Sequence, residues 1–134
     1  MTDQILKISR IYKDLDLAFT AHPVTGDIVK KFDVNAVKQA MRVLISTEFY
    51  ERPFDPKKGA GLRGMLFEPM SGLTADAIGR IILDLYNTYE IRTRVDRVDV
   101  IPNYDTNTYD ITIFFYIVGI DSPQILSANL TRLR

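Results

Sequence analysis

Two segments of the chain repeat apolar residues at helical spacing, and the first begins near Asp33. Aspartate is a favourable N-cap, and the helix is expected to end before Pro53, since a residue preceding proline disfavours the α conformation. The apolar stripe expected to be buried is Val34, Val37, Met41, Leu44 and Ile45, and the residues expected to face away are Asn35, Lys38, Gln39 and Arg42.

The second helical segment has an N-terminal signature of its own. Thr74 is the predicted N-cap, and Asp76 would place a negative charge near the positive end of the helix dipole. Leu73 and Ile78 stand at the two positions of a hydrophobic staple. The predicted buried stripe consists of Ile78, Ile81, Ile82, Leu85 and Tyr89.

Alternating apolar residues then predict two strands, Arg94–Pro102 and Tyr109–Val118. In the first, Val98 and Val100 are expected on one face, and Val95 and Ile101 on the other. In the second, one face is apolar throughout, while the other starts polar and ends apolar. That change predicts cover on both faces of the sheet, with the second cover supplied by a partner. The fully apolar face consists of Tyr109, Ile111, Ile113, Phe115 and Ile117.

The tail from Pro123 to Arg134 fits two patterns. Leu126, Ala128 and Leu130 alternate as in a strand, whereas Leu126, Leu130 and Leu133 have helical spacing. We favour a strand because a turn-rich segment follows the preceding strand. The predicted fold is α+β: a single domain, residues 1–134, with two main helices packed on one face of a small, mainly antiparallel sheet.

Composition narrows the class of protein. The 134 residues are 46% hydrophobic and 25% charged, with a formal net charge of zero and no cysteine. A neutral chain offers no general attraction to nucleic acid, and thiolate metal sites are excluded. The charged N-terminal segment is not expected to be a signal peptide, and no apolar run approaches the roughly 20 residues of a membrane span. We therefore expect a soluble protein of the cell interior.

Candidate catalytic residues are few. The single histidine, His22, is a weak basis for a metal site or a general base. The segment Lys57–Gly64 lacks the Gly-Lys-Ser/Thr ending of a phosphate-binding loop. A glycosidase would need two carboxyl groups about 5–9.5 Å apart across a cleft, a distance that sequence does not give. The acidic residues considered for such a pair are Glu48, Glu51, Asp55, Glu68 and Glu90.

Glu90 and Arg92 flank one residue at the predicted end of the second helix. Two interpretations remain open. The residues could form an ordinary exposed ion pair, worth under about 1 kcal/mol, or a half-buried charged pair that another subunit recognises.

The order of three segments resembles a known family. They are Thr47–Pro69, Leu73–Arg92 and Arg94–Val118, and the first contains the pattern T-x-x-x-E-R-P-F-x-P-x-x-G-x-x-L followed by Leu-Phe-Glu-Pro. Together they resemble the baseplate wedge proteins, or sheath initiators, of contractile phage tails, with relatives in pyocins and type VI secretion. The family signature after the second helix is Glu-Pro-Arg. Here Ile91 replaces the proline between Glu90 and Arg92.

The resemblance implies a structural part of the tail baseplate rather than an enzyme. It implies assembly in the host cytoplasm onto the wedge core around the tail tube, and a sheet that accepts strands from the tail sheath protein. No cofactor, metal, nucleic acid or membrane is implied. The residues expected to dock on the wedge core are Glu90, Arg92, Glu51, Arg52, Pro53 and Phe54. The residues expected to form the sheath platform are Tyr109, Ile111, Ile113, Phe115, Ile117, Leu126, Ala128 and Leu130.

One alternative function stays open at this point. Some members of the family have carried a lysozyme-like label, and a cell-wall hydrolase would use Glu51 with Glu68 or Glu90. A concave pocket with two close carboxylates of unequal burial would favour this alternative, whereas carboxylates engaged in ion pairs would favour the structural role.

Overall fold

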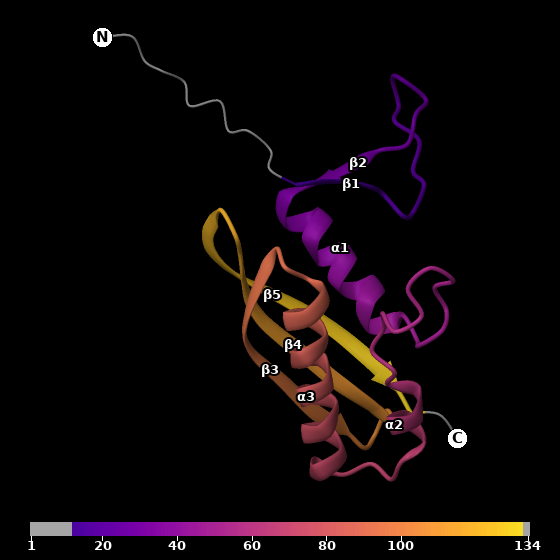
Figure 1. The fold of residues 1–134 in the computed structure, drawn as a ribbon, viewed down its shortest axis with the longest axis vertical. Helices are drawn as coiled ribbons and strands as arrows, with labels where there is room; N and C mark the ends of the chain where they lie inside the picture. Colours follow the sequence, from indigo (N-terminus) through magenta and orange to yellow (C-terminus); the bar gives the residue numbers. More distant parts are fainter. Residues whose placement is uncertain (1–11, 133–134) are drawn as a thin grey trace.

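Three long strands, β3 (Thr93–Asn103), β4 (Thr108–Ile117) and β5 (Ile120–Thr131), form an antiparallel sheet in that order. The computed structural model describes residues 12–132. The helices and the antiparallel strands occupy separate stretches of one chain, which confirms the α+β class (Figure 1). The elements, in order, are β1 (Lys13–Leu15), β2 (Lys30–Phe32), α1 (Asp33–Ser46), α2 (Arg63–Phe67), α3 (Gly72–Tyr89), β3 (Thr93–Asn103), β4 (Thr108–Ile117) and β5 (Ile120–Thr131).

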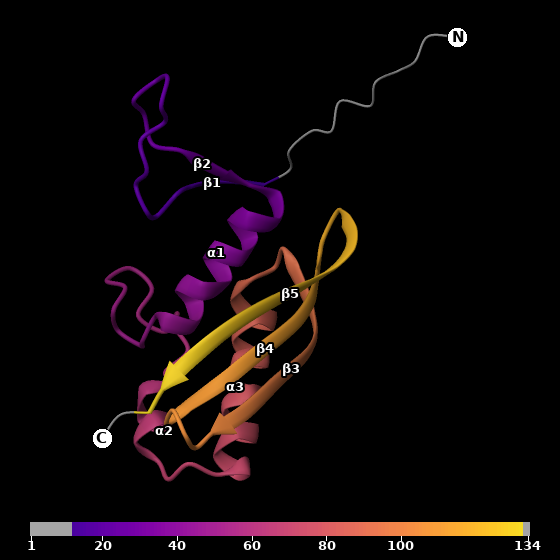
Figure 2. The same ribbon diagram turned by 180° about the vertical axis from the view of Figure 1, so that it is seen from behind.

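The two long helices lie on the same side of the three-stranded sheet. Figure 1 shows α1 and α3 in front of the strands, and Figure 2, from behind, shows the strands in front of the helices. The core fills the space between these layers. Tyr86 of α3 is fully buried, and its hydroxyl donates to the Met41 carbonyl of α1 over 2.9 Å. Burial raises the pKa of Tyr86, so its hydroxyl stays a hydrogen-bond donor.

Strand β4 is paired along both edges, and its alternation matches the sequence pattern. The residues predicted for its apolar face are each at most 2% exposed. In β3 the prediction for Val95 is wrong. A register shift between Val95 and Arg97 places Val95 opposite Phe115, on the same face as Val98. The extra residue of a bulge moves the side chains that precede it to the opposite face of the sheet. Alternation with a period of two in the sequence does not reveal such a bulge.

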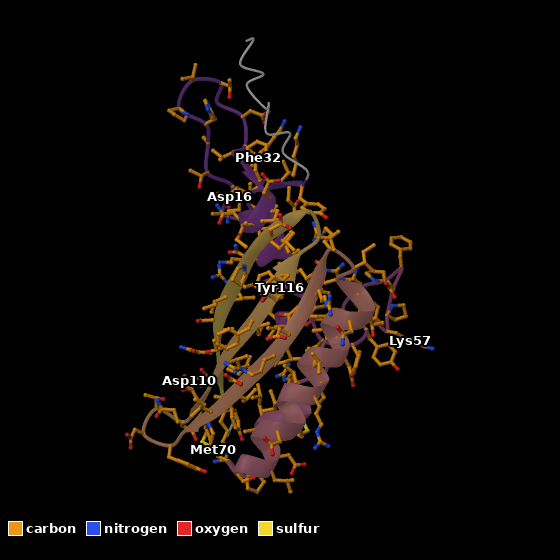
Figure 3. The ribbon with its side chains drawn as sticks, turned by 90° about the vertical axis from the view of Figure 1, so that its left-hand side faces the viewer. Asp16, Phe32, Lys57, Met70, Asp110 and Tyr116 are labelled. Carbon is orange, nitrogen blue, oxygen red and sulfur yellow. The ribbon has the colours of Figure 1, made fainter. Side chains whose placement is uncertain are left out.

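A small antiparallel hairpin, β1–β2, packs across α1 at one end of the molecule, where Figure 3 labels Asp16 and Phe32. Gln39 was predicted to face away from the core, but it is buried beneath this hairpin. Its side-chain amide donates to the Leu15 carbonyl over 2.7 Å and accepts from the Leu17 amide over 3.3 Å. The amide therefore bonds to the hairpin backbone as a neighbouring strand would.

Asp16 fixes the hairpin through an ion pair with Lys31, 3.0 Å away. The hydrogen bond from Lys31, followed by that from the Ala18 amide, lowers the pKa of Asp16. A lowered carboxyl pKa means that this stabilisation is present at neutral pH and is lost as the pH falls through that pKa.

Both predicted N-caps are wrong. Ser71, not Thr74, caps α3, because its hydroxyl accepts from the Thr74 amide over 3.2 Å. The helix therefore starts earlier than predicted, and Leu73 is 82% exposed instead of forming a staple. At α1 the cap position is Phe32, and the Asp33 carboxylate accepts from the Tyr12 amide over 3.2 Å.

Helix α3 lies close over β3 at Gly79. A Cβ built on Gly79 would lie 3.5 Å from the Val100 Cγ2 atom and 3.9 Å from the Val98 carbonyl oxygen. Between residues 12 and 132, no helix combines the length and apolar character needed to cross a lipid bilayer.

Candidate functional site

The segment between α1 and α2 is built from two consecutive turns, each with a proline at its second position. The Asp55 amide donates to the Arg52 carbonyl over 3.3 Å, and the Lys58 amide donates to the Asp55 carbonyl over 3.2 Å. Pro53 and Pro56 thus each occupy the position where a fixed φ favours a β-turn. Phe54 stands at the third position of the first turn, and its side chain is fully exposed.

Hydrogen bonds close this segment into a compact loop. The Tyr50 amide donates to the Pro56 carbonyl over 2.7 Å, and the Ala60 amide donates to the Thr47 carbonyl over 2.8 Å. The Tyr89 hydroxyl of α3 donates to the Lys57 carbonyl over 3.1 Å. We call residues 50–58 the proline loop. Figure 3 places Lys57 at the outer margin of the molecule, beside α3.

Two glycines allow the chain to pass closely behind the proline loop. A Cβ at Gly59 would lie 2.7 Å from the Thr47 carbonyl oxygen, which is backbone and cannot swing aside. At Gly61 φ is +61°, and a Cβ would overlap the ring of Phe49. The glycines of this segment therefore serve close packing and a left-handed backbone.

The Glu90–Arg92 pair lies where α3 ends and β3 begins. Arg92 Nε donates to Glu90 Oε1 over 2.6 Å, and Arg92 Nη2 donates to Glu90 Oε2 over 2.7 Å. The side chain of Glu90 is 5% exposed and that of Arg92 is 28% exposed. The hydrogen bonds to Glu90 raise the pKa of Arg92. Of the two interpretations of these residues, the half-buried bidentate pair matches this geometry.

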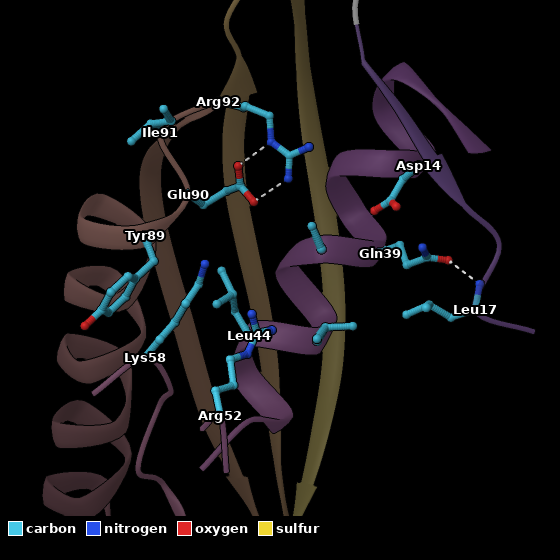
Figure 4. A pocket seen from close by; sticks show the side chains of 12 residues that line it. Asp14, Leu17, Gln39, Leu44, Arg52, Lys58, Tyr89, Glu90, Ile91 and Arg92 are labelled. Atoms are coloured by element: carbon cyan, nitrogen blue, oxygen red, sulfur yellow. Dashed lines mark hydrogen bonds and ion pairs between the residues drawn. The ribbon is translucent and has the colours of Figure 1, made fainter. Parts of the chain in front are cut away.

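A pocket of about 460 Å³ opens beside the pair. It lies between α1, the β1–β2 hairpin, the proline loop and the end of α3, and Figure 4 shows the pair at one end of it. Three charged residues reach the pocket besides the pair, Asp14, Arg52 and Lys58. Its other lining residues are Leu17, Gln39, Ala40, Val43, Leu44, Tyr89 and Ile91.

The residues predicted to dock on a wedge core fall into two groups. Glu90, Arg92 and Arg52 line the pocket, whereas Glu51, Pro53 and Phe54 project from the exposed part of the proline loop. The prediction omitted Asp14 and Lys58. Lys58 falls within the family pattern at an unspecified position. Asp14 reaches the pocket only through the packing of the hairpin on α1, for which the sequence has no signal.

The residues predicted for a strand platform support the sheet from within. Six of the eight side chains are buried in the core between sheet and helices, and those of Ala128 and Leu130 are half-buried. β4 has a hydrogen-bonded neighbour on each side, so within residues 12–132 only β3 and β5 present a free edge of this sheet. Any added strand would therefore pair with one of these two edges and not with β4.

Three of the five carboxylates considered for hydrolysis, Glu48, Glu51 and Glu90, have local partners. Glu51 accepts from the Glu48 amide over 3.0 Å, and Glu48 accepts from the Arg63 amide over 3.1 Å. Both oxygens of Glu90 are bonded to Arg92, and Glu68 lies exposed after α2. In the part of the chain described, no three acidic or histidine side chains gather as metal ligands would.

Comparison with known proteins supports the same family as the sequence motifs. No family model matches the chain. The baseplate wedge protein gp25 of Enterobacteria phage T4 is 34% identical over 117 residues, which cover 87% of this chain and 86% of gp25.

Two solved structures share the fold. One is a Geobacter sulfurreducens protein provisionally named a tail lysozyme, with a TM-score of 0.68, 17% identity, and coverage of 73% of this chain and 89% of that one. The other is a chain of the anti-feeding prophage baseplate, with a TM-score of 0.63, 20% identity, and coverage of 92% and 87%. The resemblance inferred from the motifs is confirmed: on the identity and coverage of the T4 match, this chain belongs to the family of the baseplate wedge protein gp25.

Proposed function

We propose that this protein is a structural component of a contractile-tail baseplate, without catalytic activity. The observation that carries the proposal is the 34% identity to a baseplate wedge protein across 87% of the chain. In this proposal, the bidentate Glu90–Arg92 pair and the pocket beside it are where a partner protein binds. Other baseplate wedge proteins and the tail sheath protein are the partners, and the tail tube lies nearby. The virion baseplate, assembled in the host cytoplasm, is the location.

The docking surface consists of the Glu90–Arg92 pair together with the exposed proline loop, namely Glu51, Arg52, Pro53 and Phe54. The pair offers a partner a fixed guanidinium, because Glu90 already holds two of its nitrogens in place. A partner that covers the pocket would complete the burial of this pair. Interface residues of this kind are costly to remove, since the remaining charge is left buried and unpaired.

Arg92→Ala tests the docking surface. The variant is expected to stay folded but to lose about 2–5 kcal/mol of binding free energy, and so to be missing from purified baseplates. The assay is co-expression with the other proteins of the same contractile system, followed by mass spectrometry of the assembled particles. Arg97→Ala, in an exposed ion pair, is the matched control. Normal incorporation of folded Arg92→Ala protein would count against the assignment.

The second part of the proposal concerns sheath initiation. The free edge of β5 accepts a strand from the sheath, and the predicted platform residues of β4 and β5 hold that edge in position. Backbone hydrogen bonds would supply the affinity and alternate side chains the register. The support is that β5 is a long edge strand, Ile120–Thr131, which among the described residues is paired only along the edge that faces β4.

Proline substitutions at Ser127 and Ala128 separate folding from strand addition. Successive amides along a strand point to opposite edges, so one of these two prolines removes a bond to β4 and the other removes a bond to the incoming strand. One variant should therefore lose stability, and the other should enter baseplates normally but nucleate little sheath. Two variants that both nucleate sheath as well as the unmodified chain would refute the use of this edge.

The alternative function is that of a cell-wall hydrolase. The Geobacter protein that shares the fold carries the provisional name of a tail lysozyme. At 17% identity that likeness shows only the fold. The local partners of Glu48, Glu51 and Glu90 favour the structural role. The purified protein is expected to leave peptidoglycan intact. Hydrolysis that disappears in Glu51→Gln or Glu68→Gln would reverse this conclusion.

A further inference from the structure

Phe54 is the most exposed large apolar residue of the described chain, at 102% of its reference area. Turns are usually occupied by small or polar residues, and an aromatic ring held in water forgoes the free energy of burial. Tyr50, at the start of the same loop, is 83% exposed. The proline loop thus presents two aromatic rings to solvent, where the turn itself requires neither.

The backbone beneath Phe54 is well fixed. Pro53 restricts the turn that carries the ring, and the hydrogen bonds from the Tyr50 amide and the Tyr89 hydroxyl tie the loop to itself and to α3. Tyr50 has φ of +67°, which is uncommon for a residue with a side chain and is maintained here by the bond to Pro56. A ring on such a loop loses little conformational freedom on binding. Binding hot spots are typically aromatic residues with this property.

The charges next to Phe54 specify what would surround a bound ring. Arg52 begins the first turn and Lys58 is the last residue of the loop, and both line the pocket. Neither forms an ion pair with a carboxylate among residues 12–132; the Lys58 ammonium lies 5.9 Å from the centre of the Tyr89 ring. Glu90 is committed to Arg92, and Asp14 accepts from the Leu15 amide over 2.8 Å. Two cations thus remain without a carboxylate in a pocket open to a partner.

We infer that the proline loop binds a different baseplate protein, in which an apolar pocket receives Phe54 and an acidic side chain at its rim reaches Arg52 and Lys58. This inference rests on the proposed function and adds the chemistry of the partner. The ring supplies most of the affinity, because it is wholly desolvated on binding. The cations supply orientation and rate of association, since partly exposed charges steer an encounter more than they tighten it. Arginine also matches a carboxylate with two parallel hydrogen bonds.

Photo-crosslinking in assembled baseplates tests the inference directly. Position 54 carries p-benzoylphenylalanine in the full chain, co-expressed with the other proteins of the contractile system. Position 104 carries the same group as a control, since Tyr104 is an aromatic residue 66% exposed in the β3–β4 turn. Position 54 should crosslink to a single site on another baseplate protein, with an aspartate or glutamate within a few residues of it.

Binding of the full chain to that crosslinked partner then separates the two contributions. Phe54→Ala should raise the dissociation constant about tenfold or more, and Tyr104→Ala should leave it unchanged. The double variant Arg52→Glu, Lys58→Glu should slow association and reduce its dependence on salt, whereas Lys30→Glu on the exposed hairpin should change it little.

The outcomes distinguish the inference from the function on which it rests. If the unmodified chain does not enter baseplates, the proposed function fails, and the inference falls with it. If the chain enters but position 54 crosslinks no protein, crosslinks another copy of this chain, or crosslinks a site without acidic residues, the inference alone is wrong.

Discussion

The two faces of the three-stranded sheet both carry apolar side chains, but only one of them is buried. Neighbouring residues of β4 show the contrast: Phe115 is 1% exposed beneath the helices, whereas Tyr116 on the opposite face is 44% exposed. Ile101 and Ile125 share that open face and are each more than half exposed. Apolar content therefore does not decide which face the helices cover. The covered face is the one whose apolar alternation is uninterrupted along the whole of β4.

The open face is partly covered by its own charged residues. The Arg97 guanidinium carbon lies 4.4 Å from the centre of the Phe114 ring, and Arg97 Nε lies 3.1 Å from an Asp99 carboxylate oxygen. A planar cation can shield an aromatic face while remaining hydrated at its edge. The apolar end of β4 is thus compatible with water, and cover by a partner, which the sequence pattern predicts, stays a prediction.

The largest expected difference between the faces is in aromatic packing. Phe115→Ala should lower the free energy of unfolding by about 3–5 kcal/mol, because it leaves a cavity in the core. Phe114→Ala should cost only about 1 kcal/mol, since the ring is only partly buried and its main loss is the contact with Arg97. Urea unfolding followed by circular dichroism measures both values. Equal losses would show that the open face is packed as tightly as the covered one.

Breaking the nearly buried Glu90–Arg92 ion pair should also cost more folding stability than breaking the exposed Arg97–Asp99 pair, but the difference should be smaller than for the two phenylalanines. Arg92→Ala leaves the nearly buried Glu90 carboxylate without two hydrogen bonds, and should cost about 1–3 kcal/mol of folding stability. That is a fraction of the 5–15 kcal/mol typical of a domain, so the variant stays folded. Arg97→Ala should cost under about 1 kcal/mol. Thermal unfolding at low and high salt compares the two, and a salt-sensitive loss for Arg92→Ala would argue that its pair is solvated.

The smallest difference concerns two tyrosine hydroxyls. Tyr109 is fully buried, and its hydroxyl makes no hydrogen bond within the described chain. Tyr109→Phe should leave the free energy of unfolding unchanged or raise it by up to about 1 kcal/mol, because a buried unpaired hydroxyl is costly. Tyr116→Phe, on the open face, should have no effect. A loss of more than about 1 kcal/mol for Tyr109→Phe would reveal a partner for that hydroxyl in solution.

Sequence reasoning succeeded where one face of an element is regular. The predicted strands Arg94–Pro102 and Tyr109–Val118 match β3 and β4 to within one residue at each end. The tail is a strand from Pro123 to Thr131, as part of β5 (Ile120–Thr131), and the last two residues lie outside the described part of the chain. Sequence reasoning failed where two local solutions compete. Ser71 and Thr74 are both acceptable N-caps three residues apart, and the choice depends on where the preceding loop arrives. The short helix α2 has too few residues to display a period at all.

Only part of the candidate site could be predicted from the sequence. The spacing of Glu90 and Arg92 indicated a pair, and Pro53 indicated that the first helix ends before it. The pocket beside the pair was not predictable, because it forms where the β1–β2 hairpin crosses α1 and the proline loop returns to α3. These contacts join residues distant in sequence, and only the packed fold brings them together.

The closeness of α3 to β3 at Gly79 suggests how this domain could be made more heat-resistant. The space around Gly79 accepts a methyl group at ordinary contact distance, 3.5 Å from Val100 Cγ2. Alanine is favoured over glycine inside a helix by about 1 kcal/mol, which corresponds to a rise in melting temperature of roughly 3–6 °C for a domain of this size. The substitution Gly79→Ala would thus raise the melting temperature through a change within a single helix and outside the proposed docking surface. A baseplate engineered to survive storage or heat could begin with this one position.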